Sequence, residues 1–337
     1  MRNRSPLFLG AAAVALVGAL PALGQAQSSK GAAANSSPAK TWTPARTPDG
    51  QPDLQGYWTN ATTTPLERPK ALGSKEFYTE QEMAAIDQKE RERDEKALEQ
   101  AGTPDIVHYD FSQFGLDRAQ SKSVRSTRTS LIVGPEGTIP PLLPEARKKA
   151  AERAAFDREH SFDAAEYRPL SARCLMLTYE SVPMLSAGYN NNLQIVQGRG
   201  YVAVMHEMNH SVRVIPTDGQ PHLPAGVRQW RGDSRGHWDG NTLVVDVTNF
   251  TDRNPFHGSG DKLHVVERFT RVDNDTIMYR FTVEDPATWD KPWTAEAVWS
   301  KTKGPIYEFG CHEGNYGLAN TLHGARVEEE AAKKASR

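Results

Sequence analysis

The stretch LHVVERFTRVDNDTIMYRFTVE (263–284) decides the fold. Apolar and polar side chains alternate along both of its halves, and Asp273 and Asn274 lie between them. A period of two is typical of β-strands that bury one face, and Asp and Asn favour tight turns. We therefore predict two antiparallel strands joined by a short hairpin.

Segments with the same alternation follow one another from about residue 182 onward. Asp218-Gly219 and Asp239-Gly240 lie where tight hairpins need them. Short strands joined mainly by hairpins predict a mainly β protein, either an antiparallel barrel or a sandwich. The nine predicted strands are 192–198, 201–207, 210–216, 227–232, 242–249, 263–272, 276–284, 293–301 and 306–311.

The chain before this region is mixed in character. Residues 53–60 (DLQGYWTN) predict a short first strand, and 129–142 predict a strand followed by a turn. Residues 79–100 and 144–156 have the composition of helices, the first with a charged surface. The barrel or sandwich is therefore expected to carry an N-terminal helical section.

The first 26 residues have the pattern of a secretory signal peptide. Arg2 and Arg4 precede an apolar run at 7–23, and small residues follow. A membrane anchor is the alternative, but Pro21 interrupts the run, and spanning a bilayer needs about 20 apolar residues. We expect cleavage of this segment, a periplasmic or secreted protein, and no stable membrane insertion.

Composition divides the chain into five expected parts. These are a signal peptide (1–26), a flexible leader (27–46), a strand with a helical section (47–181), an antiparallel β-barrel domain (182–326) and a charged C-terminal tail (327–337). The formal net charge is −2, and removal of the first part, which holds two arginines and no acid, makes it −4. No cluster of Lys and Arg stands out, which argues against a nucleic acid partner.

The chain has two cysteines, Cys174 and Cys311. Export would place them in an oxidising compartment, where such a pair usually bonds. A bridge closing so long a loop contributes roughly 4–5 kcal/mol in the chain-entropy model. We expect the disulfide, with two unrelated buried thiols as the alternative.

Residues 206–210 (HEMNH) spell H-E-x-x-H, which on a helix forms a zinc peptidase site. The flanking residues instead alternate and are rich in Val and Ile, which favour strands. Along a strand, positions four apart lie about 13 Å apart, so His206 and His210 could not share one zinc ion. Arg213 and Pro216 also replace the Gly and His of the extended zincin motif. We predict two strands joined by a tight turn at 208–210 and no metal site; a zinc held by one of these histidines and a distant ligand stays open.

Five motifs follow one another along the chain: PDGQPDLQGYWTN, NNNLQIVQGRGYVAVMHEMNHSVRVIPTDGQPH, WRGDSRGHWDGNTLVVDVTNF, HVVERFTRVDNDTIMYRFTVEDPATWDKPWT and YEFGCHEGN. In this order they resemble a large family of exported bacterial proteins that is abundant in acidobacteria and some proteobacteria. The resemblance covers nearly all of 47–326 and implies an exported, β-rich fold, but it assigns no catalytic residue. QGYW (55–58) is also similar to the G-x-W of lipocalin-like barrels, which bind small hydrophobic molecules and include hydratases, decarboxylases and isomerases.

His206 and Glu267 are the candidate catalytic residues, because each is expected on the apolar face of its strand. A buried carboxyl group can act as a general acid or base, and a histidine exchanges protons near neutral pH. The alternatives are a buried salt bridge from Glu267 to Arg271 or Arg280 and a histidine satisfied within the core.

Further residues are candidates for substrate binding. Inward aromatic side chains would suit an apolar ligand, and Arg235 could hold a carboxylate. Asp233 could equally satisfy loop backbone groups, and the residues after Cys311 could form a solvated loop. The candidates are Glu207, His210, Asp233, Arg235, His237, Tyr279, Trp299, His312 and Glu313.

Together these patterns predict an exported, cofactor-independent barrel enzyme. It would act by acid/base proton transfer on a small, partly apolar organic molecule, as a lyase, isomerase or hydratase. The alternative is a non-catalytic periplasmic barrel that binds a small ligand. We favour the enzyme slightly, because inward ionisable groups cost stability that purely apolar binding would not need.

Overall fold

The computed structural model describes residues 42–100, 126–177 and 180–336. The predicted signal peptide and most of the predicted leader lie outside these ranges. No helix within the described ranges combines the length and the apolar character that a membrane span requires.

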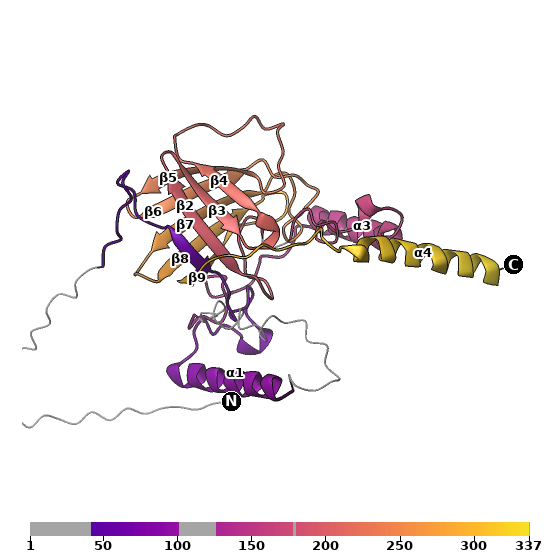
Figure 1. Ribbon diagram of the computed structural model, residues 1–337, viewed down its shortest axis with the longest axis horizontal. Helices are drawn as coiled ribbons and strands as arrows, with labels where there is room; N and C mark the ends of the chain where they lie inside the picture. The colour runs from indigo at the N-terminus through magenta and orange to yellow at the C-terminus, as the bar shows by residue number, and fades with distance from the viewer. Residues whose placement is uncertain (1–41, 101–125, 178–179, 337) are drawn as a thin grey trace, which may run out of the picture. The chain divides into compact units, whose positions relative to one another are not determined.

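Nine antiparallel strands form one sheet that curls into a nearly closed barrel (Figure 1). The predicted mainly β, lipocalin-like architecture is therefore confirmed. The order in the sheet is β4-β3-β2-β1-β9-β8-β7-β6-β5. The strands are β1 (Gly56–Thr59), β2 (Asn192–Gly198), β3 (Tyr201–His206), β4 (Val212–Pro216), β5 (Asp233–Asp239), β6 (Thr242–Thr248), β7 (His264–Arg271), β8 (Thr276–Glu284) and β9 (Trp293–Lys301).

Strand β1 comes from the N-terminal part of the chain and joins the two halves of the sheet. Trp58 lies opposite Leu193 of β2 on one side and Lys301 of β9 on the other. Its side chain is fully buried, and its Nε1–H donates to the carbonyl of Leu54 at 2.9 Å. Burial of this large ring fixes β1 in the barrel wall.

The inward faces of β7, β8 and β9 fill the barrel with large side chains. Phe269, Tyr279, Phe281 and Trp299 are all fully or almost fully buried. The rings of Tyr279 and Trp299 lie 4.9 Å apart, and those of Phe269 and Tyr279 also 4.9 Å apart. The apolar residues whose alternation predicts the hairpin at 263–284 therefore form part of the core.

The barrel has one seam, because β4 and β5 are the two ends of the sheet and share no ladder. At one point of the seam the strands approach closely. A Cβ atom on Gly236 of β5 would lie 2.9 Å from Cγ2 of Ile215 in β4. Position 236 therefore needs glycine for steric reasons. Elsewhere on the seam, hydrogen bonds between side chains of β4 and β5 connect the strands.

The described residues hold three α-helices: α1 (Glu80–Gln100), α3 (Pro144–His160) and α4 (Tyr316–Ala335). The first two confirm the helices predicted at 79–100 and 144–156. Helix α4 was not predicted, and its second half covers most of the expected charged tail. It is rich in Ala, Glu and Lys, which favour helices, and no residue of α4 is buried.

Four strand-level predictions are wrong. Residues 306–311 form no strand, and β9 pairs with β1 and β8. Residues 227–232 form only a bridge from Gln229 to Phe250, and 129–142 only a bridge from Ile132 to Ala295. Asp218-Gly219 lies in the long β4–β5 connection instead of a tight hairpin.

The H-E-x-x-H stretch has the structure predicted for it. Strand β3 ends at His206, a single 3-10 turn spans Met208–His210, and β4 begins at Val212. Asn209 has a φ of 53°, a left-handed conformation that Asn tolerates better than most residues. The two histidines therefore do not lie on one helix, and the zinc peptidase geometry is absent from this stretch.

Candidate functional site

A cleft of about 680 Å³ lies at the seam between β4 and β5. Four pieces of chain that are distant in sequence form it: 170–176, β4, the end of the β4–β5 connection, and the start of β5. Its lining residues are Leu170, Leu175, Met176, Val212, Arg213, Val214, Pro216, Leu223, Arg228, Gln229, Trp230, Arg231, Gly232, Asp233, Ser234 and Arg235.

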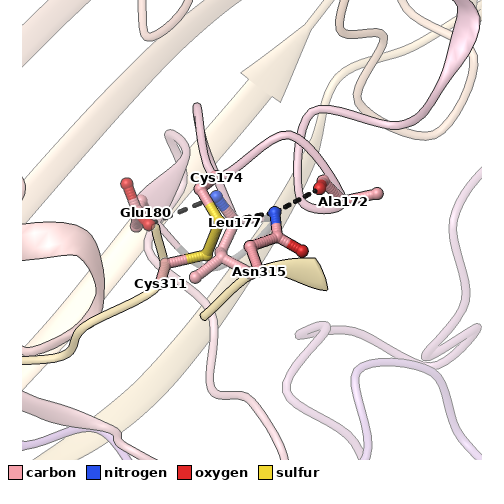
Figure 2. The surroundings of a disulfide bond; sticks show 6 residues. All are labelled: Ala172, Cys174, Leu177, Glu180, Cys311 and Asn315. Atoms are coloured by element: carbon pink, nitrogen blue, oxygen red, sulfur yellow. Dashed lines mark hydrogen bonds between the residues drawn. A yellow bond between two sulfur atoms is a disulfide. The ribbon is translucent and has the colours of Figure 1, made fainter. Parts of the chain in front are cut away.

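A disulfide anchors the first wall of the cleft. Cys174 and Cys311 are bonded, as predicted, with their Cα atoms 5.7 Å apart. Figure 2 shows Asn315 beside this bond, where its Nδ2 donates to the carbonyl of Ala172 at 3.1 Å. These contacts tie 172–174 to the C-terminal part of the chain.

The connection 217–232 forms the opposite wall and is held through Asp233. The Oδ2 atom of Asp233 accepts from the main-chain N–H of Leu223 at 2.9 Å and lies 2.8 Å from Nδ1 of His222. The other ring nitrogen of His222 lies 2.8 Å from Oδ1 of Asp246 in β6. Asp233 therefore takes the structural role that we considered as an alternative, satisfying a loop.

Arg213, which lines the cleft, takes part in a buried ion pair. Arg213 points inward from β4, and its Nη1 donates to Oε1 of Glu267 at 3.0 Å while its Nη2 donates to Oε2. Its Nε also donates to Oγ of Ser234 in β5 at 3.0 Å, so Arg213 joins the two strands of the seam. Tyr279 donates to Oε1 of Glu267 at 2.7 Å and accepts from the main-chain N–H of Met184.

The partner of Glu267 differs from the alternatives considered from the sequence. Neither Arg271 nor Arg280 reaches it. Arg271 donates to main-chain carbonyls and lies over the Trp58 ring, and Arg280 pairs with Glu296. The sequence could not identify Arg213, which is distant from Glu267 along the chain.

A second ion pair lies beside the first. Nη2 of Arg231 donates to Oε2 of Glu180 at 2.8 Å, and Glu180 also accepts from the main-chain N–H of Leu177 at 3.2 Å (Figure 2). Burial raises the pKa of Glu180, and the positive charge of Arg231 opposes that rise. Burial likewise lowers the pKa of Arg231. The pair lies where solvent is partly excluded.

Apolar side chains line the open part of the cleft. Val212 and Val214 of β4 are 49% and 57% exposed, and both point outward because Arg213 and Ile215 point inward. Leucines and a tryptophan extend this surface. All five of the exposed apolar residues here, Leu175, Val212, Val214, Leu223 and Trp230, border the one cleft.

His206 is buried at the end of β3, with 5% of its surface exposed. Its Nε2 has no hydrogen-bond partner among the described residues. Burial and the positive charges of Arg231 and Arg213 lower the pKa of His206 to about 3. The imidazole is therefore neutral at physiological pH and lies within the electrostatic field of both arginines. No hydrogen bond joins it to Glu267 in the described part of the chain.

Five of the other candidate residues fall into three groups. Tyr279 and Trp299 are core residues, and the first contacts Glu267. Asp233 and Arg235 line the cleft and form an ion pair at 2.8 Å. Glu207 is buried at the turn, where it accepts from the main chain and side chain of Asn192.

The remaining candidates lie outside the cleft lining. His237, His312 and Glu313 are exposed. The side chain of His210 lies outside what the structure describes. The expectation that the loop after Cys311 is a solvated one fits its exposure.

Arg213, Arg231, Glu180 and Trp230 contribute to the site but were not identified from the sequence. Of these residues, only Arg213 lies in a clear pattern of alternation, between two valines of a strand. The pattern predicts that the valines point inward and Arg213 outward, and the structure shows the reverse. The ionic partners are separated from one another by 51 and 54 residues, so no local pattern connects them.

Within the described ranges, no group of three or more His, Cys, Asp or Glu residues is arranged to hold a metal ion. No protein-family model matches the chain, and no curated protein matches it. Its function must therefore be inferred from the cleft.

Proposed function

We propose that this protein is an exported barrel that binds a small, partly apolar organic molecule in the cleft at the β4–β5 seam. The observation that carries the proposal is the gathering of five exposed apolar side chains around one cleft that also holds arginine donors. Ligand sites are typically concave, largely apolar and equipped with a few polar groups that orient the ligand. The disulfide supports an extracytoplasmic location, because such bonds persist in oxidising compartments.

A matched pair of valine substitutions tests the site. N-phenyl-1-naphthylamine, a neutral apolar fluorophore, should bind the wild type in a saturable one-to-one manner. Val214→Glu places a charge in the cleft and should weaken binding by roughly tenfold or more. The control is Val272→Glu, since Val272 is also exposed, at 42%, but does not line the cleft.

Equal affinity of the two variants, or a wild type that does not bind the fluorophore, would contradict a binding site at the seam. Native mass spectrometry of protein purified from periplasm then looks for the natural ligand. A small molecule that is bound to the wild type and missing from Val214→Glu would be the natural ligand, and the spectrum gives the mass of that molecule.

Acid/base catalysis as a lyase, isomerase or hydratase is the second candidate. The observation in its favour is that Nε2 of His206 is buried and has no hydrogen-bond partner among the described residues, although the pKa of about 3 makes this ring a weak base. It ranks below binding because both oxygens of Glu267 are bound to Arg213 and Tyr279. Catalysis would require turnover that is lost in His206→Gln while ligand affinity persists.

A further inference from the structure

Arg231 has hydrogen-bonding capacity that the protein leaves unused. Its guanidinium group carries five N–H donors. Its Nη2 donates to Glu180, and its Nε, although buried, has no partner among the described residues. Buried polar atoms in native proteins are nearly always hydrogen-bonded, so the unpaired Nε sets Arg231 apart, and its partly exposed guanidinium group lines the open cleft.

The other three arginines of the cleft are more fully engaged. Each donates through at least two nitrogens or to at least two acceptors of the protein. The acceptors are Glu267 and Ser234 for Arg213, the main chain and side chain of Asp261 for Arg228, and Asp233 with the carbonyls of Pro221 and Ser234 for Arg235. Arg231 is therefore the donor best able to contact a ligand.

The local field also favours an anion. Glu180, which neutralises part of the charge of Arg231, is fully buried, whereas the guanidinium remains partly exposed at the cleft. Burial lowers the pKa of the nearby His206, and the positive charges of Arg231 and Arg213 add to that effect. A positive, partly desolvated site strengthens a charge-assisted hydrogen bond.

An apolar surface adjoins this donor. Trp230 precedes Arg231 in the sequence and is 41% exposed, and Val212 and Val214 line the same cleft. An aromatic or aliphatic body could pack against these side chains while its charged end reaches the guanidinium.

We propose that the ligand is an amphipathic organic anion whose carboxylate or sulfonate group accepts hydrogen bonds from Arg231 while its apolar body packs against Trp230 and the β4 valines. This inference rests on the proposed binding function and specifies the class of ligand. It assigns Arg231 the role of anchoring the charged group.

Two fluorophores that share one apolar body and differ in a sulfonate group test whether the cleft prefers an anion. 8-Anilino-1-naphthalenesulfonate is N-phenyl-1-naphthylamine with an added sulfonate. The sulfonate should bind the wild type about tenfold or more tightly than the neutral compound, because of charge-assisted hydrogen bonds. The double variant Arg231→Met/Glu180→Gln removes both charges of the pair and should abolish this difference while leaving the neutral probe within about twofold.

The matched control is Arg268→Met/Asp239→Asn, which removes an exposed ion pair outside the cleft and should preserve the difference. Arg231→Lys keeps the positive charge and the ion pair but loses the planar guanidinium group, so this variant should bind the sulfonate with intermediate affinity. It tests the role of Arg231 if the double variant does not fold. Thermal melts identify folded variants.

Equal wild-type affinity for the two fluorophores would overturn the assignment of an anionic ligand. A sulfonate preference that survives loss of Arg231 would overturn the anchoring role of Arg231. Neither outcome would contradict the apolar cleft. A wild type that does not bind the neutral compound would instead contradict the proposed function itself.

Discussion

Arg213 of β4 and Glu267 of β7 form a two-pronged ion pair inside the barrel, where both side chains are almost completely buried. Because Arg213 also donates to Ser234 of β5, this pair lies where the sheet fails to close by backbone hydrogen bonds. The pair and the bond to Ser234 connect three strands, and Arg213 lines the cleft.

Removing one partner of this pair should destabilise the protein strongly. Glu267→Gln leaves the charge of Arg213 buried and unpaired, so we expect the free energy of unfolding to fall by about 3–5 kcal/mol. Denaturant unfolding measures it. The control Arg280→Gln breaks a more exposed pair with Glu296 and should cost less than about 1 kcal/mol. Equal effects of the two substitutions would argue against a buried pair.

Gly236 should be required for the close approach of β4 and β5. A methyl group at Gly236 would lie 2.9 Å from Cγ2 of Ile215, so Gly236→Ala should cost about 1–3 kcal/mol by overpacking. Gly226→Ala is the control, because nothing lies within 4 Å of its added Cβ. Urea unfolding measures the stability of both variants. A Gly236→Ala protein as stable as the control would contradict the close approach of β4 and β5.

The disulfide should stabilise the whole protein. Bonding residues separated by 137 positions restricts the unfolded chain, so Cys174→Ser/Cys311→Ser should lower the free energy of unfolding by about 5 kcal/mol in the chain-entropy model. The variant should also bind N-phenyl-1-naphthylamine more weakly, since 172–174 lose their anchor. Unfolding of the wild type with and without reductant provides the comparison, and unchanged stability would exclude this contribution.

His206 should make the protein less stable in acid. Its folded-state pKa of about 3 lies below its ordinary value of 6.5, so the unfolded chain binds the proton more readily between these values. Stability should therefore fall with decreasing pH through this window, by up to about 1.4 kcal/mol per pH unit from this residue. His206→Gln should remove that part of the slope, and identical pH profiles would show that His206 does not titrate as described.

His264 should have the opposite pH dependence. Its hydrogen bond to Asp246 raises the pKa of His264, although burial opposes this. The stability that this contact contributes is fully present below the pKa of His264 in the unfolded chain. It is lost as the pH rises through the higher pKa of His264 in the folded protein. His264→Asn should therefore destabilise the protein more at pH 6 than at pH 9. A loss of stability that is independent of pH would count against the ionic contact.

The sequence alone was sufficient to predict the barrel strands that alternate clearly. Residues 263–284 form the expected hairpin, because one buried face imposes a period of two and polar turn residues end each strand. Local backbone preference also explains why H-E-x-x-H is not helical. Strand β5 was missed because its residues, DSRGHWD, lack the apolar alternation of the others.

The site depended on tertiary structure, because its parts meet only after the sheet has curled. The inward position of Arg213 follows from a carboxylate 54 residues away, which compensates the cost of burying its charge. This placement turns Val212 and Val214 outward, against local hydrophobic preference, and makes them walls of a cleft. Local sequence determines which segments can be strands; the closure of the barrel decides which side chains meet at its seam.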